Sequence, residues 1–143
     1  MCASRNWGAC MEPAVAILLV EDEELIALAV QEALEDGGYA VRTVCNGAEA
    51  LSVINGSDQK ISGLITDIRL GTGPDGWELA RRAREENPGL PVVYMTGDSA
   101  ALHTSQGVPA SLVVQKPFAV AQIVTAISTL LVQARPPTET DAS

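Results

Sequence analysis

Five polar side chains stand at or just beyond the ends of short apolar runs, where they could act together on a phosphoryl group. Asp67 ends one of these runs. Each of the other runs is followed by one or two polar residues, which are Glu21 and Asp22, Thr96, and Lys116. If these runs are parallel strands, three carboxylates, one hydroxyl and one ammonium group would meet at one edge of a sheet. The pattern indicates a site for Mg²⁺ and a phosphoryl group.

The residue types suggest a role for each member of this set. Neighbouring carboxylates repel one another, which raises their pKa values unless a cation lies among them. A hard ion with oxygen ligands, such as Mg²⁺ with several waters, would relieve that repulsion. We therefore interpret Asp67 as the nucleophile, Glu21 and Asp22 as the metal site, Lys116 as the counter-charge and Thr96 as a hydroxyl donor.

Each of these residues also has an ordinary structural interpretation. The acidic run 21–24 could supply carboxylates to the first turn of a helix. Thr96 could cap a helix or a turn, Asp67 could cap a turn, and Lys116 before a proline could be a solvated lysine. The functional interpretation rests on their joint occurrence, in this order and each at the end of a strand.

The elements that must position these residues alternate along the chain. Short β-branched runs predict strands at residues 14–20, 40–44, 61–66, 91–95 and 111–114. Amphipathic stretches predict helices at residues 23–36, 48–54, 77–86 and around 123–131, with a weakly periodic fourth helix at 99–106. This alternation predicts an α/β fold, a five-stranded parallel sheet with helices on both faces. We expect the flavodoxin-like, doubly wound arrangement, whose strand order of 2-1-3-4-5 would place the ligand crevice between strands one and three.

Composition limits the classes of function. The 143 residues suit one domain at 14–132, between a flexible extension at 1–13 and a disordered tail at 133–143. The net charge of −9 opposes direct binding to nucleic acid. Three cysteines without a C-x-x-C pair fit a reducing cytoplasm, and the apolar run at 14–20 is too short to span a membrane.

Several motifs together resemble the receiver domain of bacterial two-component response regulators. The resemblance covers about residues 14–132 and rests on Leu19-Val20-Glu21-Asp22-Glu23, Leu64-Ile65-Thr66-Asp67-Ile68, Asp75-Gly76, Pro91-Val92-Val93-Tyr94-Met95-Thr96-Gly97 and Lys116-Pro117-Phe118. It implies that Asp67 accepts a phosphoryl group from a histidine kinase or a histidine phosphotransfer protein.

The resemblance also implies a division of labour within the site. Glu21 and Asp22 would form the acidic pair, and Asp22 and Asp67 would bind Mg²⁺ directly. The third protein ligand would be the backbone carbonyl of Arg69. Thr96 and Lys116 would contact the phosphoryl oxygens.

Two features depart from the family pattern. Val113 stands where the family commonly has an aromatic residue that changes rotamer on activation. The loop after Asp67, containing Gly71-Thr72-Gly73-Pro74, lacks the usual early proline and is one residue longer before Asp75-Gly76. That loop borders the path of an attacking water, so its length bears on kinase recognition and on the lifetime of a phosphoaspartate.

We therefore expect a single-domain response regulator that is not an enzyme, and that signals through a conformational shift or onward relay. It would bind a downstream protein target, or form a homodimer through the fourth helix, fifth strand and fifth helix. One alternative is a haloacid-dehalogenase-type phosphatase, but that class places a second Asp where this chain has Arg69. Another is a phosphate-independent receiver-like interaction module.

Two further expectations concern side chains outside this set. His103 lies in the weakly periodic helix and is expected on the surface, because no helical bundle supports a role as a relay histidine. Arg81, Arg82 and Arg84 are expected to form the solvated face of the third helix.

Overall fold

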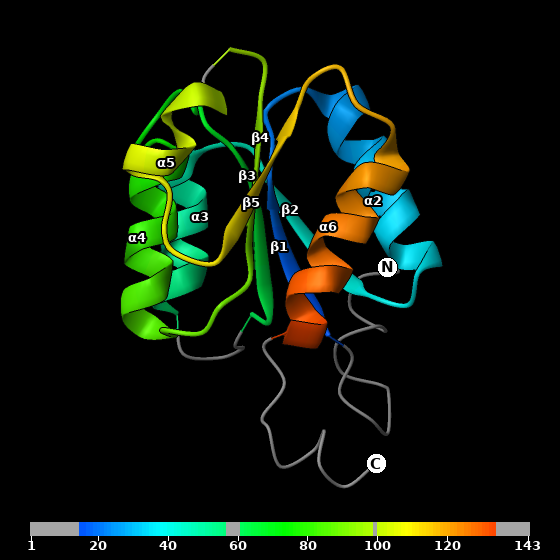
Figure 1. The fold of residues 1–143 in the computed structure, drawn as a ribbon, viewed down its shortest axis with the longest axis horizontal. Helices are drawn as coiled ribbons and strands as arrows, with labels where there is room; N and C mark the ends of the chain where they lie inside the picture. The colour runs from blue at the N-terminus through cyan, green and yellow to red at the C-terminus, as the bar shows by residue number, and fades with distance from the viewer. Residues whose placement is uncertain (1–14, 57–60, 99, 134–143) are drawn as a thin grey trace, which may run out of the picture.

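A five-stranded parallel sheet lies between two layers of helices (Figure 1). The computed structural model describes residues 15–56, 61–98 and 100–133. The strand order is β2-β1-β3-β4-β5, which confirms the predicted order and the predicted fold class. The strands are β1 (Ala16–Val20), β2 (Ala40–Val44), β3 (Gly63–Asp67), β4 (Val92–Thr96) and β5 (Ser111–Gln115).

Burial of the strands explains why their sequences are apolar runs. All five residues of β1, β3 and β4 are buried, because helices cover both faces of the central strands. The edge strand β5 instead alternates between buried and more exposed positions. Asp67 and Thr96 are the last residues of β3 and β4, so the polar groups stand at strand ends as predicted.

The helices form two unequal layers. One layer contains two long helices, α2 (Glu24–Asp36) and α6 (Val120–Gln133). The other contains the shorter α3 (Gly47–Asn55), α4 (Gly76–Glu86) and α5 (His103–Gln106) (Figure 1). The first two of these shorter helices begin at side-chain caps, since Asn46 accepts from the backbone N–H of Glu49 and Asp75 from that of Glu78.

Each helical layer closes its own hydrophobic core against one face of the sheet. The core under α2 and α6 is mainly aliphatic and includes Ile17, Leu34, Ile65 and Ile127. The core under α3 and α4 also contains two aromatic side chains, Trp77 and Tyr94. The sheet separates the two cores, so the layers contact each other mainly through the strands.

The weakly periodic segment at 99–106 is short, as its sequence indicated. It consists of a 3₁₀ turn, η1 (Ala100–Leu102), followed directly by the four-residue α5. Residue 99, the flexible extension predicted at 1–13 and the tail predicted at 133–143 lie outside the described residues, except that Gln133 ends α6. None of the helices within 15–56, 61–98 and 100–133 is long and apolar enough to cross a lipid bilayer.

Arg81 and Arg82 are exposed as expected, but His103 and Arg84 are less exposed than the sequence indicated. His103 is half-buried, because its ring packs 5.7 Å from the ring of Tyr94 and its Nε2 lies 2.9 Å from Ser111 Oγ. Arg84 is not simply solvated, because its guanidinium donates to the carbonyls of Leu90 and Ala110 at 2.7 and 3.2 Å. Arg84 therefore ties α4 to the segments before β4 and β5, and His103 ties α5 to these two strands.

Candidate functional site

The register of the sheet brings the polar strand ends to one edge. Val20 is paired with Thr66, so the residues that follow them, Glu21 and Asp67, emerge side by side from β1 and β3. Thr96 follows Met95, which is the partner of Asp67 in β4. In the next strand Thr96 is paired with Gln115, the residue before Lys116. The register therefore places Glu21, Asp22, Asp67, Thr96 and Lys116 at one edge of the sheet.

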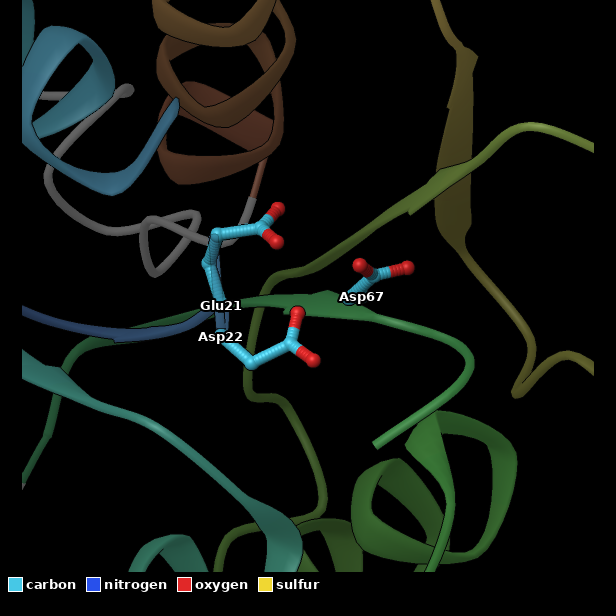
Figure 2. A group of neighbouring side chains, drawn as sticks. All are labelled: Glu21, Asp22 and Asp67. Carbon is cyan, nitrogen blue, oxygen red and sulfur yellow. The ribbon is translucent and has the colours of Figure 1, made fainter. Parts of the chain in front are cut away.

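Three carboxyl groups gather between the ends of β1 and β3, as Figure 2 shows for Glu21, Asp22 and Asp67. One oxygen from each lies within 4.8 Å of the others. Glu21 is buried and Asp22 is exposed. The cluster therefore runs from the interior of the protein out to solvent, which leaves one side open to an incoming group.

Lys116 ties the buried part of this cluster together. Its Nζ donates to Oδ2 of Asp67 at 2.9 Å and to Oε1 of Glu21 at 3.2 Å. The side chains of Lys116, Glu21 and Asp67 are only 20%, 0% and 12% exposed. The peptide bond from Lys116 to Pro117 is cis. Sequence reasoning missed one further contact, an ion pair at 3.9 Å between Lys116 and Glu23.

The electrostatic balance of the cluster is uneven. The pKa of Glu21 is raised to about 7, chiefly by burial and also by the charge of Asp67, against the lowering effects of a hydrogen bond from the N–H of Glu23 and of the nearby Lys116. Burial alone would lower the pKa of Lys116, but its hydrogen bonds and charge attraction to Asp67 and Glu21 raise it overall. The lysine therefore stays charged while the carboxylates around it remain crowded.

The loop after β3 holds Asp67 from its carboxyl side. The backbone N–H of Ile68 donates to Oδ1 of Asp67 at 2.8 Å, and the N–H of Gly76 donates to the carbonyl of Ile68 at 2.8 Å. A Cβ atom at Gly76 would collide with the backbone carbonyl of Asp67. Glycine at the start of α4 therefore lets that helix pack directly against the aspartate.

Thr96 and Arg69 differ in burial and in their contacts. Thr96 is buried, its Oγ1 accepts from the N–H of Asp98 at 3.2 Å, and its carbonyl accepts from the N–H of Lys116 at 2.7 Å. The Arg69 side chain is exposed and pairs with Asp98 at 2.7 Å. This ion pair joins the loops after β3 and β4, and no local sequence pattern could indicate it, since the two residues are 29 positions apart.

The donor set fits a hard divalent cation. Three carboxylates, one of them buried with a raised pKa, supply oxygen ligands and more negative charge than one lysine offsets. Such an arrangement favours an ion that takes oxygen ligands and keeps part of its water shell, as Mg²⁺ does. The exposed position of Asp22 leaves room for those waters.

This fold with this site defines the receiver class of signalling domains, and comparison with known families agrees. The family model for the response regulator receiver domain matches residues 17–128. The chain therefore belongs to the response regulator receiver family, whose members act in two-component signalling. Receiver domains interact with histidine kinases, are generally not enzymes themselves, and bind Mg²⁺ at an acidic pocket like the cluster of Glu21, Asp22 and Asp67.

Individual relatives support this assignment over most of the chain. The chain is 38% identical to the response regulator receiver protein CpdR of Brucella abortus, over 82% of this chain and 98% of that protein. A crystal structure of a response regulator receiver protein from Sinorhizobium medicae matches with a TM-score of 0.82 at 43% identity, covering 85% of this chain and 98% of the other.

Receiver domains also occur within longer relatives. The probable transcriptional regulatory protein TcrX of Mycobacterium tuberculosis is 31% identical over 82% of this chain but only 50% of its own length. The family assignment favours phosphoryl acceptance in signalling over the phosphatase alternative, which also lacks its second Asp at Arg69.

Proposed function

We propose that this chain is a single-domain response regulator that accepts a phosphoryl group on Asp67 from a histidine kinase or a histidine phosphotransfer protein. The observation that carries the proposal is the contact of Lys116 Nζ with both Asp67 and Glu21, inside a cluster of three carboxylates. An aspartate held between a lysine and a metal-binding acidic pair has the surroundings that phosphoryl transfer requires.

The chemistry is a transfer between two side chains. One carboxylate oxygen of Asp67 attacks the phosphorus of a phosphohistidine, and the new O–P bond forms as the P–N bond to the imidazole breaks. The imidazole leaves with the electron pair of that bond and takes up a proton. Lys116 balances the charge on the phosphoryl oxygens, and the hydroxyl of Thr96 is the second group that meets them.

The metal has its own set of residues in this proposal. Asp22, Asp67 and the backbone carbonyl of Arg69 bind Mg²⁺, and Glu21 supports the site from the buried side. When bound, Mg²⁺ neutralises charge on the phosphoryl oxygens. The exposure of Asp22 and the burial of Glu21 support this division between direct ligand and supporting charge.

Signalling follows from the added charge. Phosphorylation of Asp67 shifts a two-state equilibrium, and the shifted state relays the phosphoryl group or binds a downstream protein target. Alternatively, the shifted state forms a homodimer through the surface of α5, β5 and α6. We place the protein in the cytoplasm. We expect no direct contact with nucleic acid, because the net charge of −9 opposes binding to phosphates.

Intact-mass analysis after incubation with acetyl phosphate and Mg²⁺ tests this function. The wild type should gain one phosphoryl group, and Asp67→Asn should gain none. Asp22→Asn should lose most of the adduct, because it removes a direct ligand of the metal. Asp36→Asn is the matched control, since Asp36 is an exposed aspartate at the far end of α2, and it should be phosphorylated like the wild type.

Thermal unfolding separates metal binding from phosphorylation. At Mg²⁺ one hundredfold above its dissociation constant, the wild type should gain about 2.7 kcal/mol of stability, and Asp22→Asn should gain much less. An adduct that persists in Asp67→Asn would overturn the assignment of the acceptor. No adduct and no stabilisation by Mg²⁺ in the wild type would favour a phosphate-independent interaction module.

A further inference from the structure

A compact cluster of aromatic and hydroxyl-bearing side chains joins β4, α4, α5 and β5. It consists of Trp77, Tyr94, His103 and Ser111, and we call it the Tyr94 cluster. The Tyr94 ring centroid lies 4.6 Å from that of Trp77 and 5.7 Å from that of His103. Tyr94 is fully buried, and Trp77 and Ser111 are nearly so. None of the four residues belongs to the proposed phosphoacceptor site.

Both segments that border Asp67 run directly into this cluster. On one side the N–H of Gly76, the residue before Trp77, donates to the carbonyl of Ile68 next to Asp67, at 2.8 Å. On the other side Tyr94 precedes Thr96 by two positions in β4, so their side chains share one face of the sheet. The backbone therefore links Thr96 to Tyr94 along β4, and Gly76 links the loop after Asp67 to Trp77.

A chain of hydrogen bonds continues from Tyr94 to α5. The N–H of Val108 donates to the Tyr94 hydroxyl at 3.0 Å, and Ser111 Oγ donates to the carbonyl of Val108 at 2.6 Å. Because the Ser111 proton is used there, Ser111 Oγ accepts from Nε2–H of His103 at 2.9 Å. His103 is the first residue of α5, and a Cβ at Gly107 would collide with its ring.

The segment held by these bonds also forms one wall of a surface groove beside the acceptor. The groove has a volume of about 560 Å³ and lies between the loop after β3 and the η1–α5 segment. Its apolar lining comes from Ile68, Leu70, Trp77 and the exposed Leu102. Any shift of η1 and α5 changes the shape of this groove.

We propose that Tyr94 is a positioning residue that transmits the phosphorylation state of Asp67 to α5, through its ring contacts and its hydrogen bond to Val108. The inference rests on the proposed phosphorylation of Asp67. The Tyr94 cluster is the bistable element: its bonds hold α5 in one arrangement, and displacement of Thr96 towards a phosphoryl group releases them. Release moves Leu102 and remodels the groove.

Amide NMR spectra with and without acetyl phosphate and Mg²⁺ test the inference, with intact mass recorded on the same samples. In the wild type, phosphorylation should shift the amides of Ile68 and Gly97 at the site and those of Val108 and residues 103–106. In Tyr94→Phe the site amides should still shift, while the changes at Val108 and 103–106 should fall about twofold or more. A loss confined to Val108 and residues 103–106 distinguishes broken coupling between Asp67 and α5 from a general structural defect.

Tyr39→Phe is the matched control. Tyr39 is the second of the two tyrosines, and its hydroxyl also contacts a serine, Ser128 Oγ at 2.6 Å, but in the α2–α6 layer. This variant should keep every phosphorylation-dependent shift. Ser111→Ala breaks the chain between Val108 and His103, so it should lose the response of residues 103–106.

The outcomes separate the two proposals. Responses of wild-type size at Val108 and residues 103–106 in phosphorylated Tyr94→Phe would overturn the inference and leave the phosphorylation of Asp67 standing. An equal loss in Tyr39→Phe would also overturn it. No phosphoryl adduct in the wild type would overturn the proposed function, and the inference with it.

Discussion

The two helical layers of this receiver domain are built in different ways. The α2–α6 layer has helices of 13 and 14 residues over a mainly aliphatic core. The opposite layer ends in the four-residue α5 and is held to its loops by polar links, from Arg84, Tyr94 and His103. Among the described residues, the one non-glycine with positive φ, Ala110 at +56°, also lies there.

This difference indicates which layer is able to switch. An aliphatic core is close-packed and offers one good arrangement, so changing it costs stability directly. The α4–α5 layer also has a hydrophobic core, but its short α5 is held by directed hydrogen bonds, and each of these can be exchanged for another partner or for water at small net cost. We expect the α2–α6 layer to maintain the fold and the α4–α5 layer to respond to the state of Asp67.

The largest predicted effect comes from truncating each core in turn. Ile127→Ala removes a fully buried side chain of α6 and should cost about 2–5 kcal/mol in the free energy of unfolding, measured with urea. It should leave the phosphorylation-dependent shifts of residues 103–106 intact, because the sheet separates it from α5. Loss of those shifts in folded Ile127→Ala would contradict the expectation that only the α4–α5 layer responds to the state of Asp67.

The matched variant in the other layer is Leu79→Ala. Leu79 is equally buried in α4, so its loss should destabilise the protein to a similar extent. Because α4 carries Trp77 of the Tyr94 cluster, this variant should also reduce the response at residues 103–106. Equal responses in both variants would mean that the difference in core composition has no bearing on switching.

A smaller effect is expected from Arg84→Lys. The Arg84 guanidinium donates to two carbonyls, that of Leu90 before β4 and that of Ala110 before β5. One ammonium group cannot reproduce both bonds, so the variant should lose about 1–2 kcal/mol of stability. Amide exchange at Val108 and Ser111 should become faster, because the loop before β5 loses an anchor.

Arg42→Lys is the control for that substitution. Arg42 is exposed on β2, the edge strand farthest from β5, so the change should alter stability by less than about 0.5 kcal/mol. Equal effects of the two substitutions on urea unfolding would show that the carbonyl contacts of Arg84 add nothing to the α4–α5 layer.

The sequence was sufficient to predict the strands of the sheet and the acidic cluster around Asp67. Apolar runs ending at or before Asp67 and Thr96 predicted the strands and the site edge, because buried parallel strands have a simple local pattern and their carboxyl ends lie at one edge, whereas the strand order came from the general arrangement of flavodoxin-like folds. Glu21 and Lys116 also lie where this pattern placed them, with Lys116 donating to both acids.

The Tyr94 cluster could not be predicted in the same way. The sequence drew attention to Val113, where an aromatic side chain was expected, and not to Tyr94, which is its partner in the adjacent strand. His103 has no local periodicity that indicates burial, since its contacts come from Tyr94 and Ser111 on other elements. Tertiary contacts between short, irregular segments leave little trace in local sequence.

The smallest predicted effect is a difference in stability at alkaline pH. Burial raises the pKa of Tyr94 above its ordinary value of 10.0, although the Val108 N–H and the charges of Arg84 and Arg81 oppose the rise. The folded state therefore holds the phenol proton more tightly than the unfolded state. This contribution to stability is fully present below pH 10.0 and is lost as pH rises through the folded pKa.

The ultraviolet absorbance of tyrosinate in Tyr39→Phe measures this titration, because Tyr94 is then the one remaining tyrosine. The folded protein should titrate above pH 10.0 and the urea-unfolded protein close to it. Tyr94→Phe should lose less stability than the wild type as pH rises beyond that point. An ordinary titration in the folded state would mean that water reaches the Tyr94 hydroxyl, and a solvated hydroxyl could not hold Val108 firmly enough to control α5.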